Sequence, residues 1–307
     1  MSKNKIVVVG SLNMDLVVSA DRMPKAGETI QGSAIRYVPG GKGANQALCC
    51  ARLGAETVLI GNVGDDLFGS RLLDYLKNDG VDVRHVGIRP EVPSGIAAIT
   101  LTKEDNSIVV VPGANALTSP EDAKTLEGVL EPGDIVLLQL EIPLPTVREA
   151  LRIARAQGAV TVLNPAPYRE LDEEMLRLAH YLTPNETELE SLIGRSVASD
   201  SDLRESLGQW IKDQPSRLIV TRGARGCSYL ENGELRTVAP PRVEVVDTVG
   251  AGDAFNGGLA CGLARGWALE ESIRFAIRVS SLAVTKFGAQ EGMPTLAEVE
   301  AAGRDGN

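Results

Sequence analysis

A glycine-rich turn at residues 250–253 places an aspartate where chemistry on a phosphoryl group could occur. The apolar run at 243–246 before it is predicted to end a strand, and a helix is predicted to begin at about Ala254. The first N–H groups of a helix lack partners inside the helix, and the helix dipole favours an anion there. Asp253 could take a proton from a hydroxyl group while those N–H groups hold the developing charge. Taken alone, the motif fits equally well a turn in which Asp253 is an ordinary helix cap.

The composition limits the compartment and the kinds of partner. The chain has 307 residues, 43% of them hydrophobic, which is enough for one large α/β domain or two smaller ones. A net charge of −10 argues against nucleic acid or a membrane surface as a partner, although a glycine nest with a metal ion can still bind phosphate. The cysteines lack CxxC spacing, and neither a signal peptide nor a membrane-length apolar run is apparent, so we expect a cytoplasmic protein. His85 and His180 have no ligand partner at helical spacing, so zinc is not expected.

Polar residues recur just after predicted strands along the second half of the chain. In an open α/β sheet the ligand lies beyond the carboxyl ends of the strands. We therefore predict that these residues meet at one site. They are Glu141 after a strand at 134–139, Asn164 after 159–163, Asn185 and Glu188 after 181–183, and Thr221 and Gly223 at the end of 217–221.

The N-terminal segment carries polar residues suited to a sugar rather than to a dinucleotide. The strand at 5–9 is not followed by GxGxxG, so a dehydrogenase is not expected. Asn13 and Asp15 would share one side of an extended stretch and could bind adjacent hydroxyls, the alternative being a polar turn. Residues 39–47 bring glycines beside Lys42 at the start of a helix, without the spacing of a Walker P-loop.

Four extended stretches interrupt the α/β units. They lie at 12–18, 29–38, 94–102 and 107–111, the last two flanking a polar turn at 103–106. We predict a small β-sheet, inserted at about 11–38 and 94–112 of a single domain spanning 1–307, that serves as a lid. Its apolar residues, such as Val109 and Val111, must cover the site or a second subunit, which predicts a homodimer through the lid strands.

The motifs together resemble the ribokinase (PfkB) family of carbohydrate kinases over essentially the whole chain. The resemblance implies a three-layer α/β/α sandwich with a mostly parallel central sheet and the small inserted lid. Residues 113–116, 164–167 and 286–290 resemble the ribokinase branch more than fructokinases or adenosine kinases, which implies ATP-dependent phosphorylation of the 5-hydroxyl of D-ribose. The motifs are Asn13-x-Asp15, Gly40-Gly41-Lys42-Gly43-Ala44-Asn45-Gln46, Pro184-Asn185-Glu186-Thr187-Glu188, Thr221-x-Gly223-x-x-Gly226 and Asp247-Thr248-x-Gly250-Ala251-Gly252-Asp253.

The resemblance also implies a role for each matching position. Asp253 would be the catalytic base, and the N–H groups of Gly250, Ala251, Gly252 and Asp253 would form the anion hole. Glu188 would organise Mg²⁺ through water. The sugar would be held by Asn13, Asp15, Gly41, Lys42, Gly43, Ala44, Asn45, Glu141 and Asp253. ATP would lie along Asn185, Thr221, Arg222, Gly223, Ala224, Arg225, Gly226, Gly252 and Asp253, and K⁺ beside Asp247, Val249, Ala283, Lys286, Gly288 and Gly292.

Two positions depart from the family pattern and leave alternatives open. Family members often carry Ser where this chain has Gly292, which supplies no side-chain ligand, so the K⁺ requirement stays open. Ile277 stands where His or Asn is common near the adenine, which permits an apolar base pocket and a looser choice of nucleotide. The alternatives are a kinase of 2-deoxyribose, another pentose or a nucleoside, and a non-catalytic sugar or nucleotide sensor. Asp253 argues against the sensor, because a pure binder needs no base.

Overall fold

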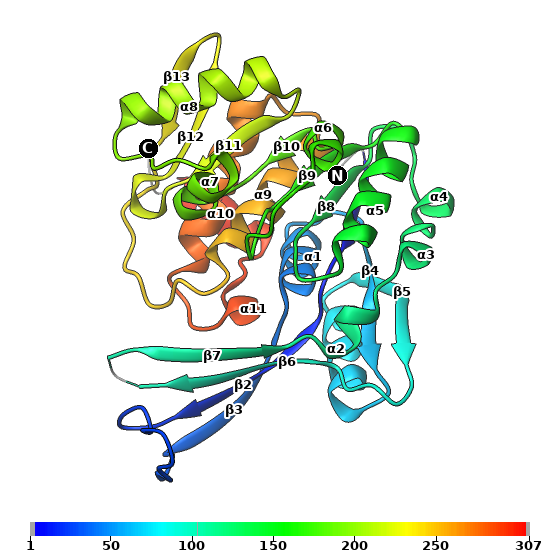
Figure 1. Ribbon diagram of the computed structural model, residues 1–307, viewed down its shortest axis with the longest axis vertical. Coiled ribbons are helices and arrows are strands. Elements are labelled where there is room, and N and C mark those ends of the chain that lie inside the picture. The colour runs from blue at the N-terminus through cyan, green and yellow to red at the C-terminus, as the bar shows by residue number, and fades with distance from the viewer. Residues whose placement is uncertain (1–3, 103, 305–307) are drawn as a thin grey trace.

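The computed structural model describes residues 4–102 and 104–304, and a nine-stranded sheet forms its centre (Figure 1). The strand order is β13-β12-β11-β10-β9-β8-β1-β4-β5. Neighbours from β5 to β11 are parallel, and β12 pairs antiparallel with both β11 and β13. The strands are β1 (Ile6–Val9), β4 (Thr57–Gly64), β5 (Val81–Arg89), β8 (Ile135–Leu138), β9 (Val160–Leu163), β10 (Tyr181–Leu182), β11 (Arg217–Thr221), β12 (Cys227–Glu231) and β13 (Glu234–Val238).

Helices cover both faces of this sheet, so the molecule has three layers. In β1, Ile6 and Val8 belong to one hydrophobic core while Val7 and Val9 belong to the other. A parallel strand that is buried on both faces reads as a continuous apolar run, which explains the β-branched sequence of β1. The predicted α/β/α sandwich is confirmed. No helix in the described part of the chain is both long and apolar enough to span a bilayer.

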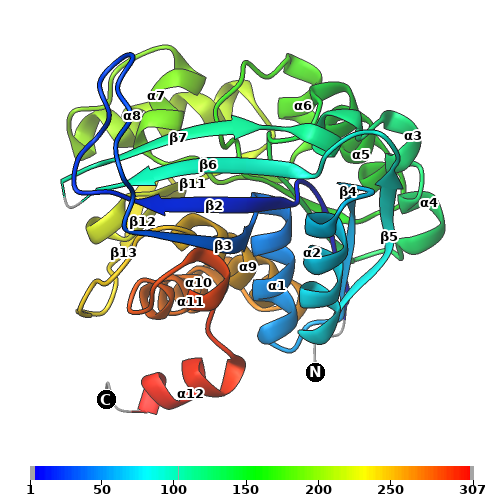
Figure 2. The same cartoon turned by 90° about the horizontal axis from the view of Figure 1, so that it is seen from below.

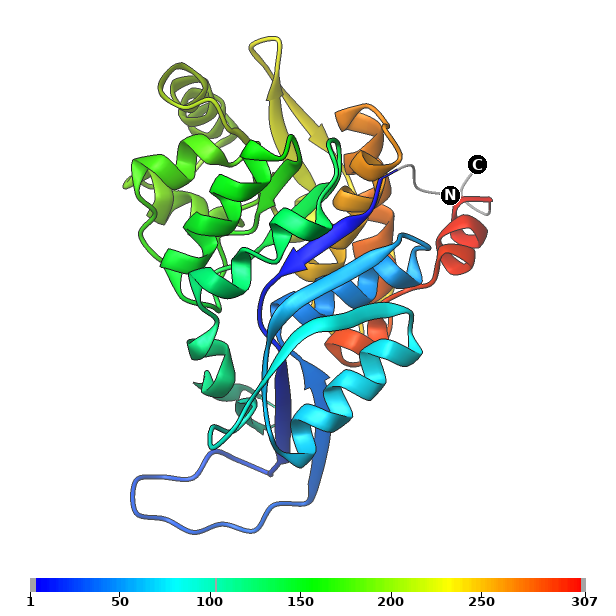
Figure 3. The ribbon, with the colours of Figure 1, turned by 90° about the vertical axis from the view of Figure 1, so that its right-hand side faces the viewer.

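The two helical layers lie on opposite sides of the sheet, as the orange-to-blue and the green helices show in Figure 3. Each layer contributes to one of the two cores. The first contains α1 (Lys42–Arg52), α2 (Leu67–Asn78), α9 (Ala251–Ala264), α10 (Leu269–Ala283) and α12 (Leu296–Arg304). The second contains α3 (Pro120–Ala123), α4 (Leu126–Val129), α5 (Leu144–Ala156), α6 (Glu173–Leu178), α7 (Glu186–Ile193) and α8 (Asp200–Asp213).

A second sheet of four strands projects from the body in Figures 1 and 2. Its order is β3-β2-β6-β7, in which only β2 and β6 are parallel. It confirms the predicted small sheet, although Lys103 in the predicted turn lies outside the described residues. The strands are β2 (Asn13–Ser19), β3 (Ala34–Gly40), β6 (Gly95–Leu101) and β7 (Asn106–Val111).

The strand predicted at 243–246 is wrong. Residues 239–250 form a loop after β13, in which Val245 and Val246 are each 58% exposed. Val246 N–H donates to Val284 O on the α10 side at 2.8 Å, and this segment pairs with no strand. β-branched residues favour a strand only where a neighbouring strand completes the ladder.

The helix boundaries around this loop also differ from the prediction. The helix expected at about Ala254 begins at Ala251, because Gly250 already accepts its first hydrogen bond, from Ala254 N–H at 2.8 Å. The helical region expected at 267–287 ends at Ala283 and is followed by the short helix α11 (Ala289–Gly292). This early end lets the chain turn back toward the start of α9.

Candidate active site

The N-terminus of α9 presents backbone N–H groups without partners. Gly250 caps the helix with φ of 80°, and a Cβ there would lie 2.9 Å from Cα of Ala289, so the position requires glycine. Ala251 N–H donates to Thr248 O at 3.2 Å. The N–H groups of Gly250, Gly252 and Asp253 have no hydrogen bond to any described residue. These three N–H groups are therefore available to an anion. The sequence predicts a fourth, that of Ala251, which is already hydrogen-bonded.

Asp253 lies in the first turn of α9 with 5% of its surface exposed. Its Oδ2 accepts a hydrogen bond from Asn45 Nδ2 at 2.8 Å, and its Oδ1 accepts one from Gln46 Nε2 at 3.0 Å. Both donors come from α1. The carboxylate is thus fixed from outside its own helix and is not an ordinary helix cap.

Lys42 and Glu188 face the same carboxylate from different elements. The negative charge of Asp253 is the main cause that raises the pKa of the Lys42 amine, and Glu141 and Glu188 add to it against burial. The pKa of Glu188 is raised mainly by burial. Glu188 also forms a capping box with Asn185 at the start of α7, with bonds of 2.8 and 2.9 Å. The site therefore combines one cation with several carboxylates.

On the opposite side of Asp253, strand β2 brings Asn13 and Asp15 to the base of the small sheet. Burial, followed by the charge of Glu141, raises the pKa of Asp15 to about 7. Asp15 Oδ1 is buried and has no hydrogen-bond partner in the described chain, which marks a place for a hydroxyl donor. Asn13 Oδ1 accepts a bond of 2.8 Å from Asn115 Nδ2, which fixes its amide.

The loop that opens α1 is held against Glu141 and Ser11. Glu141 Oε2 accepts from Lys42 N–H at 3.0 Å and from Ser11 Oγ at 2.5 Å. Gly43 N–H donates to Ser11 Oγ at 3.3 Å, and Ala44 N–H donates to Ser11 O at 2.9 Å. Gly43 and Ala44 are therefore used to position the loop, and the buried Ala44 side chain belongs to the core. Gly41 is the N-cap of α1.

A cavity of about 640 Å³ reaches the start of α9 from the other side. Its base is formed by apolar side chains that include Phe255, Ile277 and Val284, while Val243 and Val245 of the loop close over it. The predicted nucleotide residues Thr221, Gly223, Ala224, Gly226 and Gly252 all line it. A larger hollow of about 920 Å³ lies elsewhere, against α8 and the β12–β13 turn.

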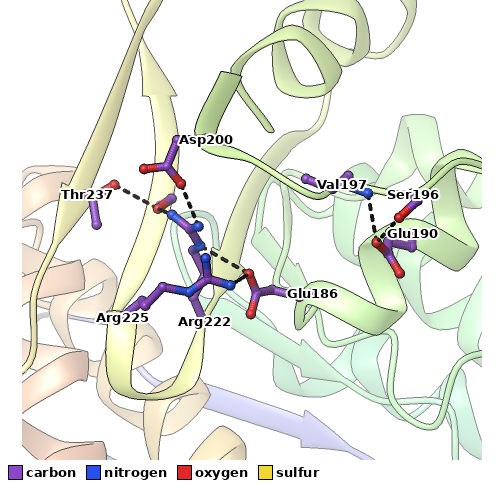
Figure 4. A network of polar contacts seen from close by, with 9 residues as sticks. Glu186, Glu190, Ser196, Val197, Asp200, Arg222, Arg225 and Thr237 are labelled. Atoms are coloured by element: carbon purple, nitrogen blue, oxygen red, sulfur yellow. Dashed lines mark hydrogen bonds and ion pairs between the residues drawn. The ribbon is translucent and has the colours of Figure 1, made fainter. Parts of the chain in front are cut away.

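The guanidinium groups of Arg222 and Arg225 are already engaged by protein partners (Figure 4). Arg222, which is 6% exposed, donates to Asp200 Oδ1 at 2.6 Å, Ser228 Oγ at 3.1 Å and Glu186 Oε1 at 3.3 Å. Arg225 donates to the same Glu186 oxygen. A contact of these residues with a nucleotide through the backbone would leave these ion pairs in place.

Carbonyl oxygens converge beside the loop between α10 and α11. A Cβ at Gly292 would lie 2.9 Å from Ala283 O and 3.7 Å from Lys286 O. Asp247 fixes the neighbouring turn by accepting from Val249 N–H at 3.0 Å and from Gly288 N–H at 2.9 Å. Lys286 Nζ donates to Glu298 instead. Across the described residues, no group of three or more His, Cys, Asp and Glu side chains could hold a metal ion.

Sequence reasoning missed the residues that orient the predicted ones. Gln46 lay inside a quoted motif without a role. Its only signal in the sequence was a polar amide in a helix otherwise rich in Ala, Leu and Cys, and the structure shows that this amide is fully buried. Asn115 and Gln290 lay in the motifs at 113–116 and 286–290 without a role of their own. Ser11 and Gln139 carried no signal, because their partners are distant in the sequence.

The three-layer fold, the inserted sheet and a buried carboxylate beside Gly252, which lines a cavity of about 640 Å³, are consistent with a kinase of small molecules. The chain belongs to the pfkB family of carbohydrate kinases, whose family model matches residues 3–296. The resemblance seen in the sequence is thereby confirmed.

Known relatives agree with this family over nearly the full length. A ribokinase of Bacillus subtilis (strain 168) is 44% identical over 295 residues, covering 96% of this chain and 98% of that protein. A deoxyribokinase of Salmonella typhi is 35% identical over 293 residues, covering 95% and 96%. The structure of Arabidopsis thaliana ribokinase complexed with ribose and ATP aligns with a TM-score of 0.90 at 33% identity, covering 97% of this chain and 98% of that one.

Proposed function

We propose that the protein transfers the γ-phosphoryl group of ATP to the 5-hydroxyl of D-ribose, giving D-ribose 5-phosphate and ADP. The observation that carries this proposal is the position of Asp253, which is held by Asn45 and Gln46 between the cavity and the Asp15 side of the site. The Bacillus subtilis relative, named a ribokinase, and the Arabidopsis thaliana ribokinase with ribose and ATP support ribose as the acceptor.

Asp253 acts as the general base in this reaction. Its carboxylate accepts the proton of the 5-hydroxyl as the oxygen attacks the γ-phosphorus. The free N–H groups of Gly250, Gly252 and Asp253 stabilise the charge on the transferring group. Ala251 contributes to this anion hole only after its amide leaves Thr248 O.

The sugar lies between the root of the small sheet and the start of α1. Asp15 Oδ1 and the free oxygen of Glu141 accept hydroxyl hydrogens, and Asn13, Lys42 and Asn45 supply further polar contacts. Gly41, Gly43 and Ala44 bring the backbone of this loop against the sugar. Closure of the small sheet over this site would exclude water and limit hydrolysis of ATP.

The nucleotide occupies the cavity beside α9, with Asn185 at its phosphates and the backbone of residues 221–226 along it. Mg²⁺ prefers few protein carboxylates and retains water, which suits Glu188, one of whose oxygens remains outside the capping box. Mg²⁺ bound with the phosphates would neutralise their charge. The apolar base pocket around Ile277 holds the base by packing.

K⁺ binds in the loop where the carbonyl oxygens of Ala283 and Lys286 converge, with Asp247, Val249, Gly288 and Gly292 completing the set. A monovalent cation there would add positive charge beside the start of α9. Because Gly292 has no side chain, the site would depend on backbone oxygens.

The protein acts as a homodimer in the cytoplasm. Both faces of β7 expose apolar side chains, among them Ile108 (53%) and Val109 (62%), on a projecting edge strand. A second small sheet would cover them. The four buried free thiols suit a reducing compartment.

A 2-deoxyribose kinase is the second candidate, favoured by the Salmonella typhi relative named a deoxyribokinase. The test is ADP release with MgATP over D-ribose, 2-deoxy-D-ribose, D-fructose and adenosine, each in potassium and in sodium. The proposal expects the highest kcat/KM with D-ribose and faster turnover in potassium. A preference for deoxyribose or a nucleoside would overturn the assignment of D-ribose as the substrate. Equal rates in both salts would overturn the proposed K⁺ site. If no substrate were turned over, a non-catalytic sugar or nucleotide sensor would become the better interpretation.

A further inference from the structure

A line of amide side chains runs through Asp253 in the buried centre of the molecule. Gln46, whose Nε2 donates to Asp253, accepts a 2.6 Å hydrogen bond on its Oε1 from Gln139 Nε2. Asn45, whose Nδ2 donates to Asp253, accepts a 3.0 Å bond on its Oδ1 from Gln290 Nε2. Gln46, Gln139 and Gln290 are completely buried, and Asn45 is 6% exposed.

The chemistry of the groups sets the direction of every bond in this line. An ionised carboxylate only accepts hydrogen bonds, so Gln46 and Asn45 must each turn an NH₂ group toward Asp253. Their carbonyl oxygens then face outward and need donors. Gln139 and Gln290 supply these donors, one on each side.

Donating these hydrogen bonds leaves Gln139 and Gln290 each with an unpaired carbonyl oxygen, which is unfavourable in a buried site. The Oε1 atoms of Gln139 and Gln290 are both buried without a hydrogen-bond partner in the described chain. A Cβ at Gly10 would lie only 2.1 Å from Gln139 Oε1, which shows how tightly the backbone just after β1 encloses that amide. Methionine could fill the same space without burying an unpaired oxygen, so what the amide adds is its N–H group.

Building on the proposed function, we propose that Gln139 and Gln290 are positioning residues that fix the amide direction of Gln46 and Asn45, so that both donate to the catalytic Asp253. They touch neither the sugar nor the nucleotide side of the site and act through their neighbours. Gln290 also lies near the small sheet, because its Nε2 is 3.4 Å from Gly40 O at the end of β3.

The matched pair Gln139→Met and Gln139→Glu tests the proposal. Met removes the donor. Glu reverses it in its ionised form, because a carboxylate would make Gln46 turn its amide outward and present Oε1 to Asp253; kcat is therefore measured up to pH 8.5, since burial favours the protonated acid. We expect kcat to fall about 3- to 10-fold in the Met variant and about 100-fold in the Glu variant, on the scale of a hydrogen bond to a charged group. KM for sugar and MgATP should change less than about threefold. The Met variant should unfold at a temperature close to that of wild type, because the Gln46 oxygen that loses its donor takes the place of the unpaired oxygen of Gln139.

A double-mutant cycle separates this role from simple packing. In a Gln46→Met background there is no amide to turn, so Gln139→Glu should lower kcat by less than about threefold further. Gln157→Glu at the end of α5, remote from the site, is the charge control and should leave kcat unchanged. All rates use the sugar that wild type turns over fastest, so a wrong substrate assignment would not be mistaken for a failure here.

Three results would overturn the proposal. The first is an equal kcat in the Gln139→Met and Gln139→Glu variants. The second is an effect of Gln139→Glu on kcat that is as large in the Gln46→Met background as in wild type. The third is a wild-type kcat in the Gln139→Met variant. If Gln139→Glu does not fold, Gln139→Met and Gln290→Met decide the question. Gln290→Met should also lower kcat with little change in stability, because it removes the unpaired oxygen of Gln290 together with the donor to Asn45. Because Asn45 is proposed to contact the sugar, Gln290→Met is further expected to raise the sugar KM.

Discussion

Asn45 and Asp253 are 208 positions apart in the sequence and are joined by a buried hydrogen bond of 2.8 Å. The bond depends on the close approach of α1 to α9. Gly257 makes this approach possible, because a Cβ there would lie 2.7 Å from both Cβ and Sγ of Cys49. The geometry around the proposed base is thus set by how two helices pack, as well as by the residues at their ends.

Gly257→Ala should therefore reduce both stability and turnover. The added methyl group overpacks the α1–α9 contact, which typically costs about 1–3 kcal/mol, and it moves Asn45 and Gln46 away from Asp253. Thermal unfolding and kcat measure the two effects. Gly208→Ala, in helix α8 with nothing near its Cβ position, is the matched control and should raise stability slightly. Equal behaviour of the two variants would refute the packing argument.

Asp253→Asn should abolish most turnover while leaving the sugar bound. Removing a general base costs about 10²- to 10⁴-fold in rate. The amide keeps the size of the side chain, so sugar affinity measured by calorimetry should change little. An Asp253→Asn enzyme with more than about a tenth of wild-type kcat would remove Asp253 from the role of base.

The affinity for the sugar should rise with pH and level off above neutrality. The pKa of Asp15 in the free protein is raised to about 7, so its carboxylate is protonated below that pH. Sugar hydroxyls need the ionised form as acceptor, so the dissociation constant should be about tenfold larger at pH 6 than at its plateau.

Calorimetric titration of D-ribose from pH 5.5 to 8.5 measures this dependence. Asp15→Asn should bind more weakly and with no pH dependence, since the amide does not titrate. An affinity that stays constant or falls with rising pH in the wild type would contradict the role given to Asp15.

Charges on β7 should prevent self-association. Ile108 and Val109 point to opposite faces of the small sheet, so the double change Ile108→Lys with Val109→Lys places a charge on each face. We expect a dimer for wild type and a monomer for this variant by light scattering at micromolar concentration. Ile211→Lys, on the equally exposed Ile211 of α8, should stay dimeric. A monomeric wild type would contradict the dimer.

The predicted site residues cluster because strand ends and glycine-rich turns mark them locally. Asp253 and the glycines before it were predicted in this way. The small sheet was predicted from extended stretches that interrupt the α/β units, and the three layers were implied by the family resemblance. The strand prediction at 243–246 failed because a β-branched run does not reveal whether a partner strand lies beside it. The proposed roles of Gln139 and Gln290 could not be predicted, although Gln290 lay in the motif at 286–290, because the tertiary fold alone fixes the partner of each amide.

The most direct test of the account is to identify the product formed from MgATP and D-ribose by ³¹P–¹H NMR. The proposed reaction gives one sugar phosphate whose phosphorus couples to the two protons on carbon 5. It should form in equal amount with ADP, and about 10²- to 10⁴-fold more slowly with Asp253→Asn. Coupling to the proton on carbon 1, or ADP with only inorganic phosphate, would contradict the proposed reaction.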